Sequence, residues 1–224
     1  VPVHKGSTVF FDNVAAMRSR TWLDRSAYTY GLHGTPTSFT LEERIATLEG
    51  GTHTMLVSSG LAAVTMVDMA VLKSGDQVLL PHNVYGPNKN FTRTELAAWG
   101  IHHAIYDAMD ASSLAAAITP ATKLVWLEAA GSVTLEFPDL RSLIHVVRER
   151  APQAVIAIDN TWGAGIAFDA FALGIDVTIH ALTKYPSGGG DVPMGAVTCK
   201  GGDDGDALYR TLALSRSRVG HGVG

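Results

Sequence analysis

The sequence has little of several features that mark particular classes of protein. It contains one cysteine, Cys199, which excludes an intramolecular disulfide and is typical of a reducing compartment, so we expect a cytoplasmic protein. No apolar run approaches the roughly 18 residues that cross a membrane, and the first residues lack the apolar core of a signal peptide. The net charge is −4 and no basic run occurs, so nothing favours binding to a membrane or to nucleic acid.

A pattern for metal binding is lacking as well. The nine histidines are scattered, none is paired with another at i, i+4, and the adjacent pair His102-His103 has no third ligand nearby. We therefore expect no metal site. What is present is an ordinary folded composition, with 46% hydrophobic and 17% charged residues in 224. This length is enough for one large domain with a sizeable core.

From residue 38 onward, segments with strand patterns alternate with segments with helix patterns. Such alternation predicts a doubly wound α/β fold with a mostly parallel sheet and right-handed crossovers. The first helix is expected to start at Thr40, with Glu43 completing a capping box. We expect helices at 40–48, 59–72, 87–99, 111–118, 140–150 and 203–215, and strands at 55–57, 78–80, 101–106, 123–127, 154–158, 176–180 and 194–198.

Residues 1–37 differ from the rest of the chain. They are polar and irregular, and their few apolar residues cannot form a core of their own. We expect this segment to be an arm that packs on a neighbouring subunit, followed by an α/β domain over 38–224. The chain ends in loop-like sequence, from which a fragment of a longer protein is expected.

Two residues at predicted strand ends indicate the chemistry of the site. Asp159 ends the wholly apolar run 154–158, and Lys184 follows the strand 176–180. Ligands of open α/β sheets bind at the carboxyl ends of the strands. One lysine and one carboxylate at this edge are what pyridoxal 5′-phosphate (PLP) requires, because the lysine forms a Schiff base and the acid pairs with the pyridine nitrogen.

Two further segments fit a phosphorylated aromatic cofactor, although each has a simpler interpretation. Ser59-Gly60-Leu61 follows a strand and opens a helix, where free N–H groups bind anions; it could equally be a capped strand-to-helix turn. Tyr85 follows the strand 78–80 and could stack on a flat ring; on this segment alone, a half-buried surface tyrosine is the simpler reading. Neither segment carries the glycine fingerprint of a dinucleotide site, which argues against a dehydrogenase.

The motifs taken together resemble the Cys/Met-metabolism family of PLP enzymes, which have fold type I, across almost all of the chain. Within this family, Glu128-Ala129-Ala130-Gly131-Ser132, Asp159-Asn160-Thr161-Trp162 and Gly174-Ile175-Asp176-Val177 are most similar to the cystathionine β-lyase branch. The resemblance implies the large PLP-binding domain of the aspartate aminotransferase type. The other motifs that carry it are Tyr30-Gly31-Leu32-His33-Gly34-Thr35-Pro36-Thr37, Leu48-Glu49-Gly50-Gly51, Ser59-Gly60-Leu61-Ala62-Ala63, Tyr85-Gly86 and Thr183-Lys184-Tyr185.

The resemblance implies a role for each matching residue. Lys184 would bind PLP and move protons at Cα, Asp159 would keep the pyridine nitrogen protonated, and Tyr85 would stack on the ring. Tyr30 would reach the phosphate in a neighbouring subunit, and it joins Lys184 and Tyr85 in the expected catalytic set.

The remaining contacts implied by the resemblance concern the cofactor phosphate. Gly60 and Leu61 would donate backbone N–H groups to it, and Thr183 would donate its hydroxyl. With Tyr30 from the arm, these residues complete the expected cofactor-binding set.

The activity implied is a C–S β-lyase that cleaves cystathionine, a small amino-acid substrate, to homocysteine, pyruvate and ammonia, as in methionine biosynthesis. A γ-acting relative, either a γ-synthase or a γ-lyase, is the first alternative, and a catalytically silent protein on the same fold is the second. The assembly implied is a homotetramer built as a dimer of dimers.

The sequence departs from the family pattern in three places. Leu32 stands where the family has an arginine that contacts the phosphate, which leaves open whether His33 replaces it. Gly188-Gly189-Gly190-Asp191 replaces a Gly-His-Ser-Asp segment after the lysine. The smaller C-terminal domain of the family, which supplies an arginine for the substrate carboxylate, is expected to be absent from this chain.

Overall fold

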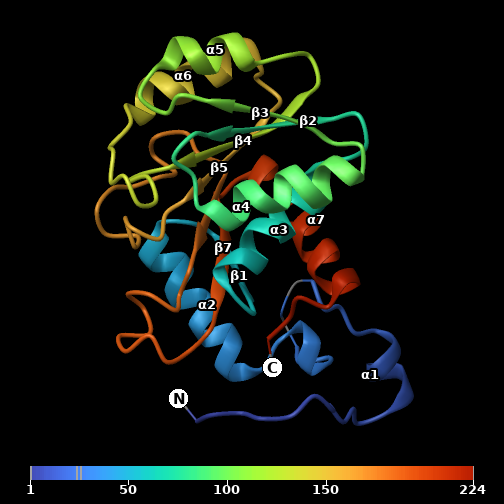
Figure 1. Cartoon of the computed structure of the whole chain (residues 1–224). Coiled ribbons are helices and arrows are strands. Elements are labelled where there is room, and N and C mark those ends of the chain that lie inside the picture. Colours follow the sequence, from blue (N-terminus) through green and yellow to red (C-terminus); the bar gives the residue numbers. More distant parts are fainter. Residues whose placement is uncertain (1, 24, 26, 224) are drawn as a thin grey trace.

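A computed structural model describes residues 2–23, 25 and 27–223. Positions 1, 24, 26 and 224 of the predicted arm and domain lie outside this description. The architecture is one seven-stranded sheet covered by helices on both faces (Figure 1). The strands are β1 (His53–Val57), β2 (Gln77–Pro81), β3 (His102–Tyr106), β4 (Thr122–Glu128), β5 (Val155–Asp159), β6 (Val177–His180) and β7 (Gly195–Cys199).

Most of the helices lie where the sequence predicts them. The first of them, α1, belongs to the segment that was expected to be irregular. The helices are α1 (Val14–Arg18), α2 (Pro36–Glu49), α3 (Gly60–Val71), α4 (Gly86–Phe91), α5 (Ala111–Ala117), α6 (Leu140–Arg150) and α7 (Asp203–Val219), with a 3₁₀ turn η1 (Gly31–His33) and a π-helical segment η2 (Thr92–Leu96).

The sheet is mostly parallel, as predicted. Its strand order is β1-β7-β6-β5-β4-β2-β3. The pairs from β6 through β3 are parallel, whereas β7 is antiparallel to both of its neighbours, β1 and β6. The carboxyl ends of β2, β4, β5 and β6 therefore meet at one edge, which is where the candidate site lies.

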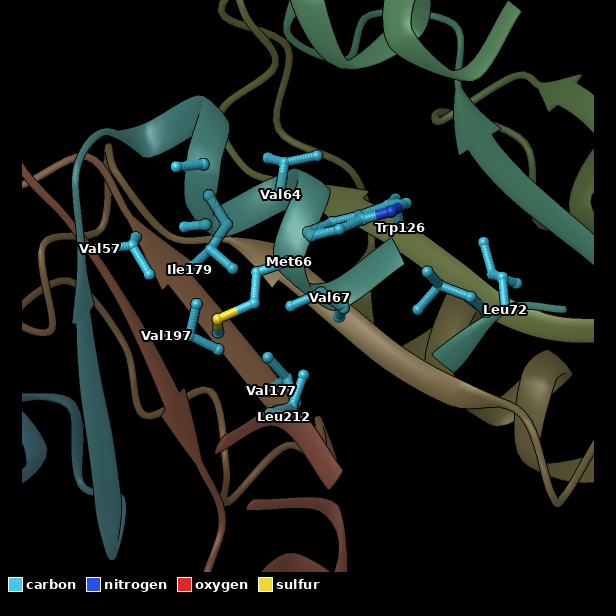
Figure 2. Packing of buried hydrophobic residues seen from close by; sticks show 14 of the residues in the cluster. Val57, Val64, Met66, Val67, Leu72, Trp126, Val177, Ile179, Val197 and Leu212 are labelled. Carbon is cyan, nitrogen blue, oxygen red and sulfur yellow. The ribbon is translucent and has the colours of Figure 1, made fainter. Parts of the chain in front are cut away.

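Two large apolar clusters fill the space between the sheet and its helices. Figure 2 shows the cluster on one face, where Met66 and Val67 of α3 pack against Trp126, Ile179 and Val197 of the sheet. Helix α7 covers the same face. On the other face α5 and α6 pack against β2 to β5. Helices cover both faces of strands β4 and β5, which explains why each strand is a continuous hydrophobic run.

Helix α2 starts earlier than predicted. The expected cap at Thr40 is wrong, because Thr35 caps the helix and forms a capping box with Ser38. Pro36 occupies the first helical position, where its fixed φ suits the helix and its missing N–H costs nothing. The helix ends at Glu49 because Gly50 adopts a left-handed conformation, with φ of 75°. The sequence prediction gave weight to Glu43 and overlooked the threonine–proline start.

Two other predicted helices also differ from the structure. The helix expected at 87–99 begins one residue earlier, as α4, and continues through the π-helical η2. Helix α7 extends to Val219, beyond the predicted end at residue 215. Within the described part of the chain, no helix is long and apolar enough to cross a membrane.

Part of the segment before α2 packs against the α/β domain of the same chain. Trp22 and Leu23 pack against the cluster that contains α3 and α7. The residues nearer the N-terminus extend along the outside of the molecule (Figure 1), and their apolar side chains are exposed, as at Phe10 and Val14. An exposed segment of this kind agrees with an arm that contacts another subunit, which remains a prediction.

Candidate active site

The predicted site residues gather at the carboxyl edge of the sheet. Strands β4 and β5 pair so that Glu128 lies opposite Asp159, and β5 pairs with β6 so that Asp159 lies opposite Ile179. Helix α3 begins close to the end of β6, because a Cβ on Gly60 would lie 2.7 Å from the Cβ of Ala181. The start of α3 and the ends of these strands thus surround one region.

Asp159 is a buried carboxylate that forms no ion pair among the described residues. Its Oδ1 accepts a hydrogen bond of 3.0 Å from the backbone N–H of Thr161. Burial raises the pKa of Asp159, and the hydrogen bonding from Thr161 opposes this rise. A buried carboxylate without an ion-pair partner is costly, so this position is suited to a cationic group of a ligand.

Glu128 is a site residue that was not predicted from the sequence, although it begins a segment that carries the family resemblance. It is 2% exposed; its Oε2 accepts a hydrogen bond of 2.7 Å from the Tyr85 N–H, and Ser132 Oγ donates to its Oε1. Burial and, next, the charge of Asp159 raise the pKa of Glu128 to about 7. The available signal was the one used for Asp159, an acid at the end of an apolar strand.

Tyr85 lies at the start of α4 and its side chain is 40% exposed. Because Glu128 holds its backbone N–H, the position of Tyr85 is tied to the end of β4. Tyr30 lies on the arm, 49% exposed, with its ring edge toward His33 at 5.9 Å between centroids. The structure gives Tyr30 no contact with Asp159 or Lys184, so its predicted role in a neighbouring subunit stays a prediction.

Lys184 follows β6 in a turn, where its backbone N–H donates to Ala181 O at 3.0 Å. Its side chain is exposed and forms no hydrogen bond or ion pair within the described residues, so the amine is available to a ligand. The turn continues through Gly188 and Gly190, whose φ angles of 72° and 69° favour glycine.

Thr183 forms two hydrogen bonds to Met194, and its predicted donation to the cofactor phosphate stays a prediction. Its hydroxyl donates to Met194 O at 3.2 Å and accepts from Met194 N at 3.1 Å. This pair of bonds fixes the lysine turn to the segment before β7. Donation to a phosphate would require the hydroxyl to exchange its bond to Met194 O for the new one.

The start of α3 has the form of an anion site. Ser59 caps the helix, and its Oγ accepts from Ala62 N at 3.0 Å. The N–H groups of Gly60 and Leu61 have no helical carbonyl one turn earlier to bind, since the first intrahelical bond runs from Ala63 N to Ser59 O, and they remain for a ligand. The lack of a side chain at Gly60 is required by the approach of Ala181.

These features fit PLP. The buried carboxylate of Asp159 matches the ring nitrogen of the cofactor. The amine of Lys184 matches its aldehyde, and the N-terminus of α3 matches its phosphate. The described residues include no group of three or more His, Cys, Asp and Glu side chains that could hold a metal ion.

His33 lies beside Leu32, which stands where the family has an arginine that contacts the phosphate. Its ring stacks on Trp22 at 4.4 Å, Nδ1 lies 3.0 Å from Thr29 Oγ1, and Nε2 lies 3.4 Å from Ser217 Oγ. Burial, followed by the charges of Arg216 and Arg20, lowers the pKa of His33. The imidazole is therefore engaged within its own chain and poorly suited to replace a cationic phosphate contact.

Comparison with known proteins agrees with this site. The profile of the Cys/Met metabolism PLP-dependent enzyme family matches residues 1–222. The chain belongs to this family. Among its members, cystathionine β-lyase of Escherichia coli is 36% identical over 88% of this chain and 50% of its own length. Cystathionine γ-lyase of Mus musculus is 34% identical over 87% of this chain and 48% of its own length.

A solved structure shares the fold of this chain. The structure of cystathionine γ-synthase from Xanthomonas oryzae pv. oryzae, in complex with aminoacrylate and cysteine, superposes with a TM-score of 0.88 at 28% identity. The superposition covers 99% of this chain and 54% of that chain. The predicted fold class and the PLP dependence of the family are confirmed, and the chain spans about half the length of the relatives it matches.

Proposed function

We propose that the protein is a PLP-dependent C–S β-lyase that cleaves cystathionine to homocysteine, pyruvate and ammonia. The observation that carries the proposal is the placement of Asp159 and Lys184 at one edge of the sheet beside the free N-terminus of α3. Support for the β-position comes from the relatives, among which cystathionine β-lyases of several bacteria recur.

The residues would divide the work as follows. Lys184 would hold the cofactor and, once displaced by the substrate amine, would remove the Cα proton. Asp159 would hold a proton on the ring nitrogen, and the ring, when bound, supplies a sink for the electrons released at Cα. Gly60 and Leu61 would bind the phosphate through their N–H groups, Thr183 through its hydroxyl, and Tyr85 would cover the ring.

The overall reaction balances with one water. Breaking the Cβ–S bond of cystathionine releases homocysteine as a thiol, and the remaining three-carbon unit takes up water to give pyruvate and ammonia. Lys184 would also return a proton to the departing sulfur, since its exposed amine has no hydrogen-bond or ion-pair partner among the described residues.

The test measures absorbance and product together. The protein incubated with PLP should show the visible band of a lysine-bound cofactor, and added cystathionine should change the band and yield pyruvate. Lys184→Ala should lack the band and lose activity by about 10³-fold or more. Pyruvate release by Lys184→Ala at the normal rate would refute the proposal.

A γ-acting enzyme is the second candidate, favoured by the match to a γ-lyase and by the superposition on a γ-synthase. It would give 2-oxobutyrate or a γ-replacement product, so the product distinguishes the two. A protein that shows no lysine-bound band would instead be a silent member of the family.

The proposal extends to assembly and location. We expect a homotetramer made of two dimers, with Tyr30 entering the neighbouring site, and the exposed apolar side chains of the arm at Phe10 and Val14 support such a contact. The single cysteine, which is buried and unpaired, supports a cytoplasmic location.

A further inference from the structure

Three buried polar side chains meet beneath the carboxyl ends of β5 and β6. Glu49 ends α2, Asn160 follows β5, and His180 ends β6. Glu49 Oε2 accepts from Asn160 Nδ2 at 2.8 Å, and Glu49 Oε1 lies 3.0 Å from His180 Nδ1. The Glu49 carboxylate thus links the residue that follows Asp159 to the end of β6, the strand that precedes the Lys184 turn.

The burial of Glu49 makes both of these contacts necessary. The exposed fraction of its side chain is 0%, and that of His180 is 1%. The carboxylate also lies at the C-terminal end of a helix, where the helix dipole is unfavourable to negative charge. A carboxylate oxygen accepts hydrogen bonds, so the contact with His180 Nδ1 is a hydrogen bond in the tautomer that carries its hydrogen on Nδ1.

The two strand ends are already joined by backbone contacts. Asn160 N donates to Ile179 O at 2.9 Å, and Ala181 N donates to Thr161 Oγ1 at 3.0 Å. These bonds join the two strands to each other, whereas Glu49 joins both of their ends to α2. Asn160 directly follows Asp159, and His180 lies four residues before Lys184.

We propose that Glu49 is a positioning residue of the cofactor site: by binding Asn160 and His180 together, it sets the distance between Asp159 and Lys184. The inference rests on the proposed binding of PLP at these two residues. Glu49 itself touches no reacting atom and acts through its two partners.

Electrostatics within the group point the same way. Burial raises the pKa of Asp159, the hydrogen bonds from Thr161 lower it, and the charge of His180 lowers it further, while that of Glu49 raises it. The pair formed by His180 and Glu49 thus acts on Asp159 with opposite signs. Loss of Glu49 would change the geometry of Asp159 and its electrostatic surroundings at once.

Glutamine at position 49 would break one half of the bridge. A carboxamide offers one acceptor oxygen in place of two, so its NH2 group faces either Asn160 Nδ2, which is a donor, or His180 Nδ1. Nδ1 can accept from this NH2 group only if the ring hydrogen moves to Nε2, which is buried and has no hydrogen-bond partner among the described residues. The shape and volume of the side chain are kept. Glu49→Gln therefore removes one contact without opening a cavity.

The same helix supplies a matched control. Glu42 is also buried, and it accepts from Leu56 N at 2.9 Å and pairs with Arg25 at 2.9 Å, so it contacts neither strand end that leads to the site. Glu42→Gln should lower the melting temperature of the apoprotein and leave PLP affinity unchanged. Glu49→Gln should bind PLP about tenfold more weakly.

The experiment titrates PLP into the apoprotein of each variant and of the wild type, following the visible band, and records the apoprotein melting temperature. Asn160→Ser removes the other end of one contact and serves if Glu49→Gln fails to fold; it should weaken PLP binding to a similar extent. Equal affinity for wild type, Glu49→Gln and Asn160→Ser would overturn the inference. Equal weakening by Glu42→Gln would overturn it too, because the effect would then be general loosening of α2.

The proposed function fails in a different way. If the wild-type protein itself shows no lysine-bound band, the site does not hold PLP and the proposed function is lost. If the wild type shows the band and the variants at positions 49 and 160 match it, only the role of Glu49 is lost.

Discussion

Glu128 and Asp159 lie opposite each other in the parallel register of β4 and β5, at the last residue of each strand. Paired residues of neighbouring strands point to the same face of a sheet, so the two carboxylates face the same side of the site. Both are buried, and burial raises the pKa of each. Burial of both carboxylates favours a proton on the pair, and a cation bound beside the pair would favour loss of that proton.

Stability of the apoprotein should depend on the proton of Glu128. Its pKa is about 7 in the folded chain against 4.5 in the unfolded chain, so the native state binds more protons between these values. The free energy of unfolding therefore falls as pH rises through about 7. Relative to Glu128→Gln, the wild type should lose stability between pH 5 and pH 8, as measured by urea unfolding. A stability difference that stays constant over this range would contradict the assignment.

The contact between Gly60 and Ala181 should control phosphate binding. A methyl group on Gly60 would lie 2.7 Å from Ala181 Cβ, closer than carbon atoms approach, so α3 must shift. We expect Gly60→Ala to lose about 1–3 kcal/mol of stability and to bind PLP more weakly. The double variant Gly60→Ala/Ala181→Gly removes the closest clash and should recover most of both losses. No recovery in the double variant would place the cause elsewhere.

Much of the edge could be predicted because it follows from single strands. The apolar run before Asp159 predicts a strand covered on both faces, and the acid that ends it must then lie at the edge of the sheet. Lys184 and Tyr85 follow from the same rule at β6 and β2. The order of the strands and the antiparallel β7 could not be predicted, because they depend on pairing between residues far apart in sequence.

Contacts between elements explain what the sequence analysis missed. The position of Glu128 in the site depends on its hydrogen bond with the backbone of Tyr85, 43 residues earlier. That of Glu49 depends on its contact with His180, 131 residues later. Neither pairing leaves a local pattern. The start of α2 was missed for a local reason, because Thr35 and Pro36 were assigned to the arm motif and not to the helix.

Asp68 should give a second pH-dependent term, remote from the site. It is fully buried in α3, and its Oδ1 accepts from Trp126 Nε1 at 2.8 Å. Burial raises the pKa of Asp68 to about 7, and the Trp126 hydrogen bond opposes this rise. The folded chain keeps the proton above the ordinary pKa of 3.8, so stability is lost as pH rises through about 7.

Asp68→Asn keeps an acceptor for Trp126 and carries no charge at any pH. Between pH 4 and pH 8 the wild type should lose up to about 4 kcal/mol relative to this variant, as measured by chemical unfolding. Bound PLP should leave this difference unchanged, in contrast to the difference for Glu128→Gln. A parallel pair of stability curves would show that Asp68 is ionised throughout.

Asp176 should stabilise the fold without acting on the site. Its carboxylate pairs with Arg148 at 2.7 Å and with Lys200 at 2.7 Å, and it accepts from Ile156 N at 2.8 Å, so it joins α6, β5 and the end of β7. The side chains of Arg148 and Lys200 are 33% and 32% exposed, so water partly solvates their charges when the ion pairs are broken.

We therefore expect Asp176→Asn to cost about 2 kcal/mol, below the cost for a fully buried pair. Glu149→Gln is the control, since the contact of Glu149 with His145 is 3.9 Å long and exposed, and its loss should cost less than about 0.5 kcal/mol. PLP affinity should match the wild type in both variants, because Asp176 lies at the amino end of β6, opposite to the site. Weaker PLP binding by Asp176→Asn at a temperature where it is folded would show that strain at this end of β6 reaches the lysine turn.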